Sequence, residues 1–165
     1  LGLACTLMPS DSSAPLLQAA FSLASPQQAE QFLVVLSASP PDWLVRSILG
    51  SECINRPALH AAVAAALEFP AYYGHNWDAM DECITDLEWL PATRYLIHID
   101  GIEHLLPNDP GGFTQFLGVL LDAHRSWRHP EARGQAVPIH VLFSGSQAGL
   151  ARVRAAVPEE HRAEA

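Results

Sequence analysis

Carboxylate side chains gather on one predicted helix in the middle of the sequence. At about 100° per residue, the residues from Trp77 onward divide into an apolar stripe and a polar face. The stripe consists of Trp77, Met80, Ile84 and Leu87, and the opposite face of Asp78, Asp81, Glu82 and Thr85. Between residues 72 and 103 the chain has seven acidic residues and one basic residue, Arg94. Carboxylates without cations of their own indicate contact with a cationic partner.

A metal centre is the main alternative for the same side chains. His75, Asp78 and Glu82 are three and four residues apart, close enough on one helix face to bind a metal ion. The candidate further ligands are His98, Asp100 and His104. Their spacing matches no zinc or two-metal signature, and eight histidines make such coincidences frequent. A metal-dependent enzyme is therefore the less favoured hypothesis.

Other catalytic patterns are missing from the sequence. Ser144-Gly145-Ser146 follows a predicted strand but lacks the Gly-x-Ser-x-Gly pattern of a nucleophile elbow. The sequence indicates no His–Asp pair that would activate this serine, and it contains no glycine-rich phosphate loop. We therefore expect a non-catalytic protein that needs no cofactor.

Several residues of the acidic segment also have a structural explanation. Asp78 in the first turn would stabilise its own helix through the macrodipole, although the dipole does not explain Glu82 further along. Of the adjacent Tyr72 and Tyr73, we expect Tyr73 to pack against the protein. A turn that requires a positive φ would account for Gly74.

Length and composition exclude several classes of protein. The chain has 165 residues, of which 49% are hydrophobic and 16% charged, and this predicts a folded domain. A formal net charge of −9 argues against direct binding of nucleic acid. Three cysteines without metal-like spacing fit a reducing compartment. Since neither a secretory signal nor a transmembrane stretch is visible, we expect a cytoplasmic protein.

Alternating strand and helix patterns predict the elements that hold the acidic segment. The predicted strands cover residues 43–49, 94–100 and 137–143, and the predicted helices cover 58–67, 113–127 and 146–157. Ser25-Pro26 is typical of a helix start, and residues 14–24 predict another short amphipathic helix. Residues 33–36 fit a helix or a strand equally well, and residues 158–165 predict a frayed tail.

A boundary is predicted near residue 40. Pro40-Pro41 ends a helix and favours an extended connection. We expect residues 1–41 to form a partly helical N-terminal extension and residues 42–165 to form one α/β domain. Strands that alternate with helices predict a short parallel sheet.

The acidic segment resembles the barstar-like family of intracellular inhibitors of bacterial ribonucleases. The residues that carry this resemblance, without a gap, are Pro70, Tyr72-Tyr73-Gly74, Asn76, Asp78-Ala79 and Glu82. The order of the predicted elements agrees with it over residues 42–146. The resemblance implies a small three-stranded parallel sheet packed with helices, to which the N-terminal extension is added.

The resemblance also implies which residues bind the partner. It assigns Tyr72, Gly74 and Asn76 to a contact loop, Asp78 and Glu82 to an acidic face, and Asp122 to the periphery of the interface. Together with their neighbours, the predicted partner-binding residues are Tyr72, Gly74, His75, Asn76, Asp78, Asp81, Glu82, Asp86 and Asp122.

Three positions depart from the family pattern. Glu82 is one methylene longer than the family's central aspartate, Asp81 replaces an aromatic contact residue, and Leu87 replaces a tryptophan. The resemblance therefore implies an inhibitor that blocks the active site of a basic ribonuclease one-to-one. An immunity protein or regulatory module aimed at a different toxin is the alternative that these departures leave open.

Overall fold

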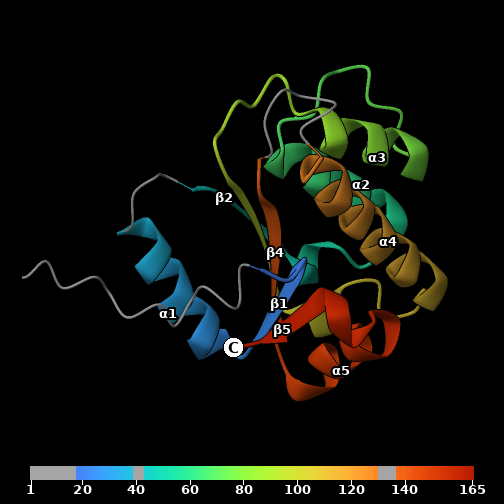
Figure 1. Cartoon of the computed structure of the whole chain (residues 1–165). Coiled ribbons are helices and arrows are strands. Elements are labelled where there is room, and N and C mark those ends of the chain that lie inside the picture. Colours follow the sequence, from blue (N-terminus) through green and yellow to red (C-terminus); the bar gives the residue numbers. More distant parts are fainter. Residues whose placement is uncertain (1–17, 39–42, 130–136) are drawn as a thin grey trace, which may run out of the picture.

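A parallel sheet of five strands forms the centre of the protein (Figure 1). The computed structural model describes residues 18–38, 43–129 and 137–165. The strands lie in the order β2-β3-β4-β1-β5. Their bounds are Phe21–Ala24 for β1, Leu44–Leu49 for β2, Tyr95–Asp100 for β3, Ile139–Ser144 for β4 and Arg162–Glu164 for β5. The predicted α/β class and parallel sheet are confirmed, whereas the prediction of three strands is wrong.

The two additional strands come from segments that were predicted to be helical or frayed. β1 was assigned to a helix over residues 14–24, yet all four of its residues are buried. It pairs with β4 on one side and β5 on the other. A strand covered on both faces reads as a continuous apolar run, which periodicity does not distinguish from a buried helix. β5 lies in the segment that was predicted to be a frayed tail. Its pairing partner is β1, so it could not be predicted as a strand without β1.

Helices cover both faces of the sheet (Figure 1). On one face α1, Pro26–Ser37, packs through Phe32 and Leu36 on Leu96 and Leu142 of the sheet. On the other face lie α2, Arg56–Ala66; α3, Trp77–Asp86; α4, Pro110–Trp127; and α5, Gln147–Ala156. The run at residues 33–36 is therefore helical. Of the extension predicted for residues 1–41, β1 is a strand of the same sheet and α1 packs on that sheet. Residues 1–17 and 39–41 lie outside the described part.

Capping side chains define where the five α-helices begin. The N-cap residues are Ser25, Asn55, Asn76, Asp109 and Ser146, and each accepts a hydrogen bond from a backbone N–H in the first turn. Ser25 and Gln28 form a reciprocal capping box, so the predicted helix start at Ser25-Pro26 is confirmed. Three 3₁₀ turns, Gly50–Glu52, Ile102–His104 and Glu159–His161, complete the described elements.

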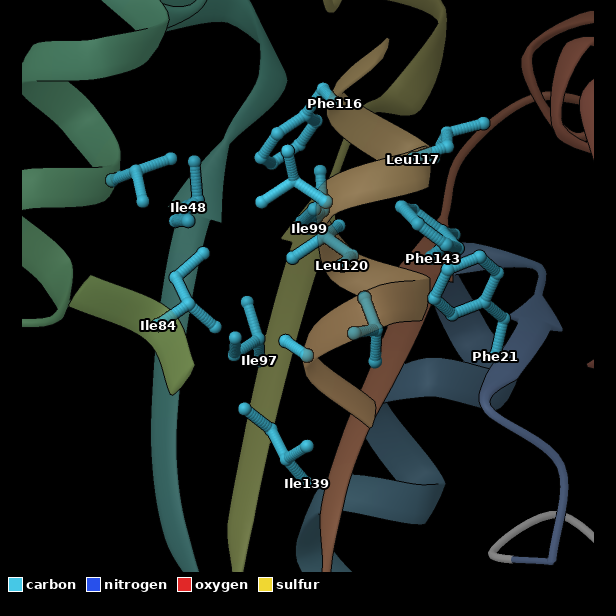
Figure 2. Close-up of a cluster of buried hydrophobic side chains, with 14 of the residues drawn as sticks. Phe21, Ile48, Ile84, Ile97, Ile99, Phe116, Leu117, Leu120, Ile139 and Phe143 are labelled. Atoms are coloured by element: carbon cyan, nitrogen blue, oxygen red, sulfur yellow. The ribbon is translucent and has the colours of Figure 1, made fainter. Parts of the chain in front are cut away.

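The main core lies between the sheet and α4 (Figure 2). Phe116 and Leu120 of α4 point toward Ile97 and Ile99 of β3, and Ile84 reaches the same layer from α3. These side chains are almost completely buried. Burying a side chain of this size stabilises the fold by about 1.5–3 kcal/mol. α3 and α4 are therefore held against the sheet as one layer.

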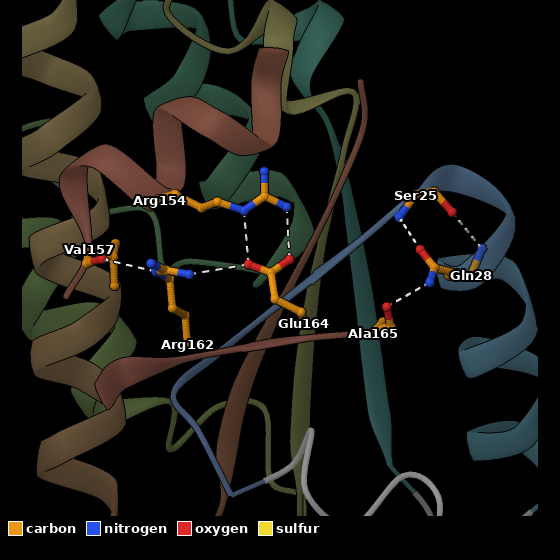
Figure 3. A network of polar contacts seen from close by, with 7 residues as sticks. All are labelled: Ser25, Gln28, Arg154, Val157, Arg162, Glu164 and Ala165. Atoms are coloured by element: carbon orange, nitrogen blue, oxygen red, sulfur yellow. Dashed lines mark hydrogen bonds and ion pairs between the residues drawn. The ribbon is translucent and has the colours of Figure 1, made fainter. Parts of the chain in front are cut away.

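A polar network fastens β5 to both helical layers (Figure 3). Glu164 accepts two hydrogen bonds from Arg154 of α5, at 2.9 and 2.8 Å, and a third from Arg162 at 3.2 Å. On the other side, the Gln28 amide of α1 donates to the backbone oxygen of Ala165 at 2.6 Å. The closing strand is therefore tied to α5 through side chains and to the start of α1 through the backbone.

Glu164→Ala is expected to lower the free energy of unfolding by about 0.5–1 kcal/mol, because it removes a bidentate but solvent-exposed ion pair. The hydrogen bond from Arg154 lowers the pKa of Glu164, so this stabilisation is present above the ordinary value of 4.5 and is lost as the pH falls through the lower folded-state pKa. Urea unfolding at pH 7 and at pH 3 measures both effects. The exposed Glu159, changed to Ala, is the control. An equal loss at both pH values would contradict this role of the ion pair.

Candidate partner-binding surface

α3 presents its polar face to solvent because its apolar face is fixed inside the protein. Met80, Ile84 and Leu87 are 1% exposed or less. The Trp127 indole of α4 donates a hydrogen bond to the Ile84 carbonyl at 2.8 Å. The helix ends at Leu87, which adopts a left-handed conformation with φ 46°. The rotation of α3 about its axis is therefore set by contacts within the core.

The polar face of α3 carries three carboxylates with different surroundings. Asp78 and Glu82 are exposed, whereas Asp81 is half-buried. The Asp81 Oδ1 atom is buried and makes no hydrogen bond to a described residue. Burial is the main cause that raises the pKa of Asp81, and the charges of Asp122, Asp78 and Glu82 add to it. In the described part of the chain, Asp81 is therefore a partly desolvated carboxylate with one oxygen that has no hydrogen-bond partner.

The predicted acids outside the centre of this face are placed differently. Asp122 lies exposed on α4, close enough to raise the pKa of Asp81, and pairs with Arg125 at 3.5 Å. Asp86 is half-buried at the last position of α3 and has an interaction partner. We call Asp78, Asp81, Glu82 and Asp122 the acidic surface. It spans two packed helices.

The loop before α3 presents one tyrosine and buries the other. Tyr72 is 76% exposed, whereas Tyr73 is 6% exposed and its hydroxyl contacts Nδ1 of the buried His60. The prediction that Tyr73 packs against the protein is confirmed. Phe69 and His75 pack against the Tyr73 ring, at 4.8 and 4.7 Å between ring centroids. A rigid aromatic base therefore supports the exposed Tyr72.

Two non-glycine residues of the loop between α2 and α3 have a positive φ, Glu68 and His75, whereas Gly74 does not. His75 has φ 51°, a region that non-glycine residues rarely occupy. A Cβ at Gly74 would lie 3.0 Å from Nδ2 of Asn76. Asn76 caps α3 by accepting from Ala79 N at 2.9 Å and donates to Gly74 O at 3.3 Å. The side chain of Asn76 thus serves the helix start, a role that its position before the helix could have indicated.

The candidate metal ligands are not brought together. His98 and Asp100 lie on β3 and line the face of the sheet under α1, whereas α3 covers the opposite face. Among the described residues, no three His, Cys, Asp or Glu side chains form a group that could hold a metal ion. The spacing of His75, Asp78 and Glu82 in the sequence therefore does not correspond to a group of metal ligands among the described residues.

One polar cluster was missed in the sequence. Ser144, at the end of β4, donates a hydrogen bond to Asp100 Oδ1 at 2.7 Å, and its Oγ lies 2.8 Å from His98 Nε2. The sequence indicated no His–Asp pair for this serine. Ser144 lies 44 positions after Asp100 and 46 after His98, and it meets them only because β3 and β4 pair in parallel. A prediction of the register between β3 and β4 could have indicated this cluster, because Asp100 and Ser144 are partners in that register.

Two solved structures resemble the fold. The ORC2 protein of Aeropyrum pernix, in ADPNP–ADP complexes, matches with a TM-score of 0.56 and 13% identity over 90% of this chain and 42% of that chain. A chain of Drosophila ORC bound to AT-rich DNA and Cdc6 matches with a TM-score of 0.50 and 13% identity over 92% and 50% of the two chains. At this identity the likeness shows the fold alone. This chain spans half or less of each matched chain.

Comparison with protein families identifies the chain. No curated protein matches it. None of the described helices is long and apolar enough to cross a membrane. The model of the family Barstar (barnase inhibitor) matches residues 43–144, which include β2 to β4, the exposed tyrosine and the whole acidic surface. The match covers more than half of the 165 residues, and the chain therefore belongs to the barstar family.

Proposed function

We propose that this protein inhibits a bacterial ribonuclease by covering its basic active site with the acidic surface and Tyr72. The observation that carries the proposal is the carboxylate of Asp81, which has a buried oxygen without a hydrogen-bond partner among the described residues and three further acids nearby. A buried polar atom without a hydrogen bond costs about 1–3 kcal/mol. A partner that supplies a cation would remove this cost on binding.

The chemistry of a ribonuclease matches this surface. An enzyme that cleaves RNA holds the scissile phosphate with Arg and Lys side chains. The carboxylates of Asp78, Asp81 and Glu82 offer those side chains charge-assisted hydrogen bonds, bidentate in the case of arginine. Because all three lie on one helix, little conformational entropy is lost when they bind. The net charge of −9 would also accelerate encounter with a basic enzyme.

Tyr72 supplies the apolar part of the proposed interface. Large aromatic side chains are enriched among the residues that dominate binding energy. Its ring is exposed, while its neighbours Tyr73 and Asn76 are fixed by internal hydrogen bonds. The loop would therefore bind in the conformation that it already has, with little ordering cost.

A toxin other than a ribonuclease is the second candidate target. Asp81 and the buried Leu87 stand at positions where the family pattern has aromatic residues, so this interface is more acidic and less aromatic. Such a change favours a partner with more cations at its active site. For either target we propose action in the bacterial cytoplasm, which the two free, buried cysteines Cys53 and Cys83 support.

Glu82→Ala is expected to weaken binding to a barnase-like ribonuclease by about 2 kcal/mol or more, roughly 30-fold, because a central interface charge is lost. The melting temperature should stay unchanged, since the side chain is exposed. Titration calorimetry at low and high salt, with RNA cleavage followed in parallel, measures the effect. Glu88→Ala, which removes an exposed acid outside α3, is the control. If Glu82→Ala lowers the melting temperature while the folded molecules bind the ribonuclease with an unchanged dissociation constant, Glu82 does not act at the interface.

Asp81→Asn is expected to weaken the same complex by about tenfold or more and yet to stabilise the free protein at pH 7. The pKa of Asp81 is raised in the folded state, so its ionised form disfavours folding. This stability gain should shrink as the pH falls through the folded-state pKa and vanish below 3.8, where the aspartate is protonated in both states. Thermal unfolding from pH 7 to about pH 3 measures it.

Glu88→Gln is the matched control for Asp81→Asn, because Glu88 is exposed, lies outside α3 and is not among the charges that raise the pKa of Asp81. It should not raise the melting temperature. A variant at Asp81 that binds as tightly as the unchanged protein would show that the buried carboxylate does not meet the partner.

A further inference from the structure

A cavity of about 460 Å³ opens at the carboxyl ends of β3 and β4, beside α1. The connection that leaves β1 runs through α1 on one face of the sheet, whereas the connection that leaves the neighbouring β4 runs through α5 on the other face. In open parallel sheets, ligands bind in the crevice where neighbouring connections diverge in this way. The cavity lies next to this crevice, under α1, and its strand residues come from β3 and β4. It is on the opposite face of the sheet from α3.

The floor of the cavity is a fixed polar cluster of His98, Asp100 and Ser144. Ser144 is completely buried, and its hydroxyl hydrogen is used in the bond to Asp100. The contact with His98 Nε2 therefore requires that this nitrogen carries a hydrogen and donates it to Ser144 Oγ. Burial lowers the pKa of His98, so at neutral pH the ring is uncharged and its Nδ1 is an acceptor. Among the described residues, Nδ1 has no hydrogen-bond partner.

The charges around the cavity select a cation. Asp100 makes no ion pair with a described residue, Glu30 lies in the wall formed by α1, and the lining includes no Lys or Arg. A phosphate would also lack donors here. The chain passes from β1 to α1 through Ser25 alone, the N–H groups of Ser25 and Gln28 are used in the capping box, and Pro26 has no N–H.

The remaining wall is apolar. Ala29, Leu33 and Val34 of α1 line the cavity, and Val34 is 62% exposed. A short alkyl group placed against them would bury apolar surface that the free protein leaves in water. An acidic, acceptor-bearing floor with one apolar wall fits a ligand that has a cationic head and an alkyl body.

We propose that this cavity binds a small organic cation of the alkylammonium class. Its ammonium group would lie between Asp100 and Nδ1 of His98, and its alkyl body would lie along Leu33 and Val34. Glu30 adds a second negative charge at the α1 wall. Ser144 acts as a positioning residue, because it is completely buried and its hydroxyl holds both His98 and Asp100 in place.

Three probes of equal length test the proposal: n-hexylamine, n-hexanoate and n-hexanol. Each is titrated at pH 7 against the full chain, and binding is followed through the imidazole resonances of His98. Hexylamine should give saturable shifts, and its dissociation constant should be at least tenfold lower than that of either other probe. Equal binding of hexanol would overturn the cation selectivity. Absence of saturable binding by hexylamine would overturn the site.

Two variants of the exposed Val34 test the charge selectivity without changing the residues of the cavity floor. Val34→Lys places an ammonium group at the cavity wall and should weaken hexylamine binding at least tenfold. Val34→Gln, of similar length but uncharged, should weaken it less than threefold. Asp100→Asn should abolish the preference for hexylamine over hexanol wherever the variant is folded. Unchanged selectivity in both Val34→Lys and Asp100→Asn would show that hexylamine binds elsewhere.

Discussion

Burial of the apolar stripe of α3 is the constraint on which the candidate interface depends. Met80, Ile84 and Leu87 occupy the layer shared with α4 and the sheet, and the indole of Trp127 holds the Ile84 carbonyl. With this stripe fixed, the other side chains have no freedom to turn inward. Asp81 lies at the border between the two faces, where it is partly desolvated without gaining a partner. The packing that stabilises the helix therefore also desolvates the carboxylate of Asp81 and raises its pKa.

Local patterns were enough to predict α3, its polar face and β3, because each has a clear period and a clear boundary. They could not identify β1, a buried four-residue segment in which Ser22 is polar, or β5, whose charged residues become a strand only through pairing with β1. Within the site, the packing of Tyr73 against the protein followed from the sequence. The half-burial of Asp81 did not, since it depends on how close α4 and Asp122 come. Nor did the cluster at Ser144, which requires the register of two strands.

The family match and the fold describe different portions of the chain. The match to the barstar family model ends with β4, whereas β1 and β5 widen the sheet and α1 covers it outside the matched residues. The likeness to the ORC2 protein covers 90% of this chain and concerns this wider sheet. In this chain Ser25 alone separates β1 from α1, which leaves no room for a glycine-rich loop between them. The protein thus has two separate surfaces, an acidic one on α3 and a cavity under α1, and a core of apolar side chains between them.

The two edges of the sheet differ in how readily they would accept a strand from another molecule. β5 is three residues long and carries Arg162 and Glu164, whose charges oppose the addition of a further strand. β2, at the other edge, is six residues long, carries one charged residue, Arg46, which pairs with Glu68, and exposes 45% of Leu49. Short and charged edges are poor templates for intermolecular pairing, whereas longer apolar ones are better. Aggregation of the folded protein through its sheet would therefore begin at β2.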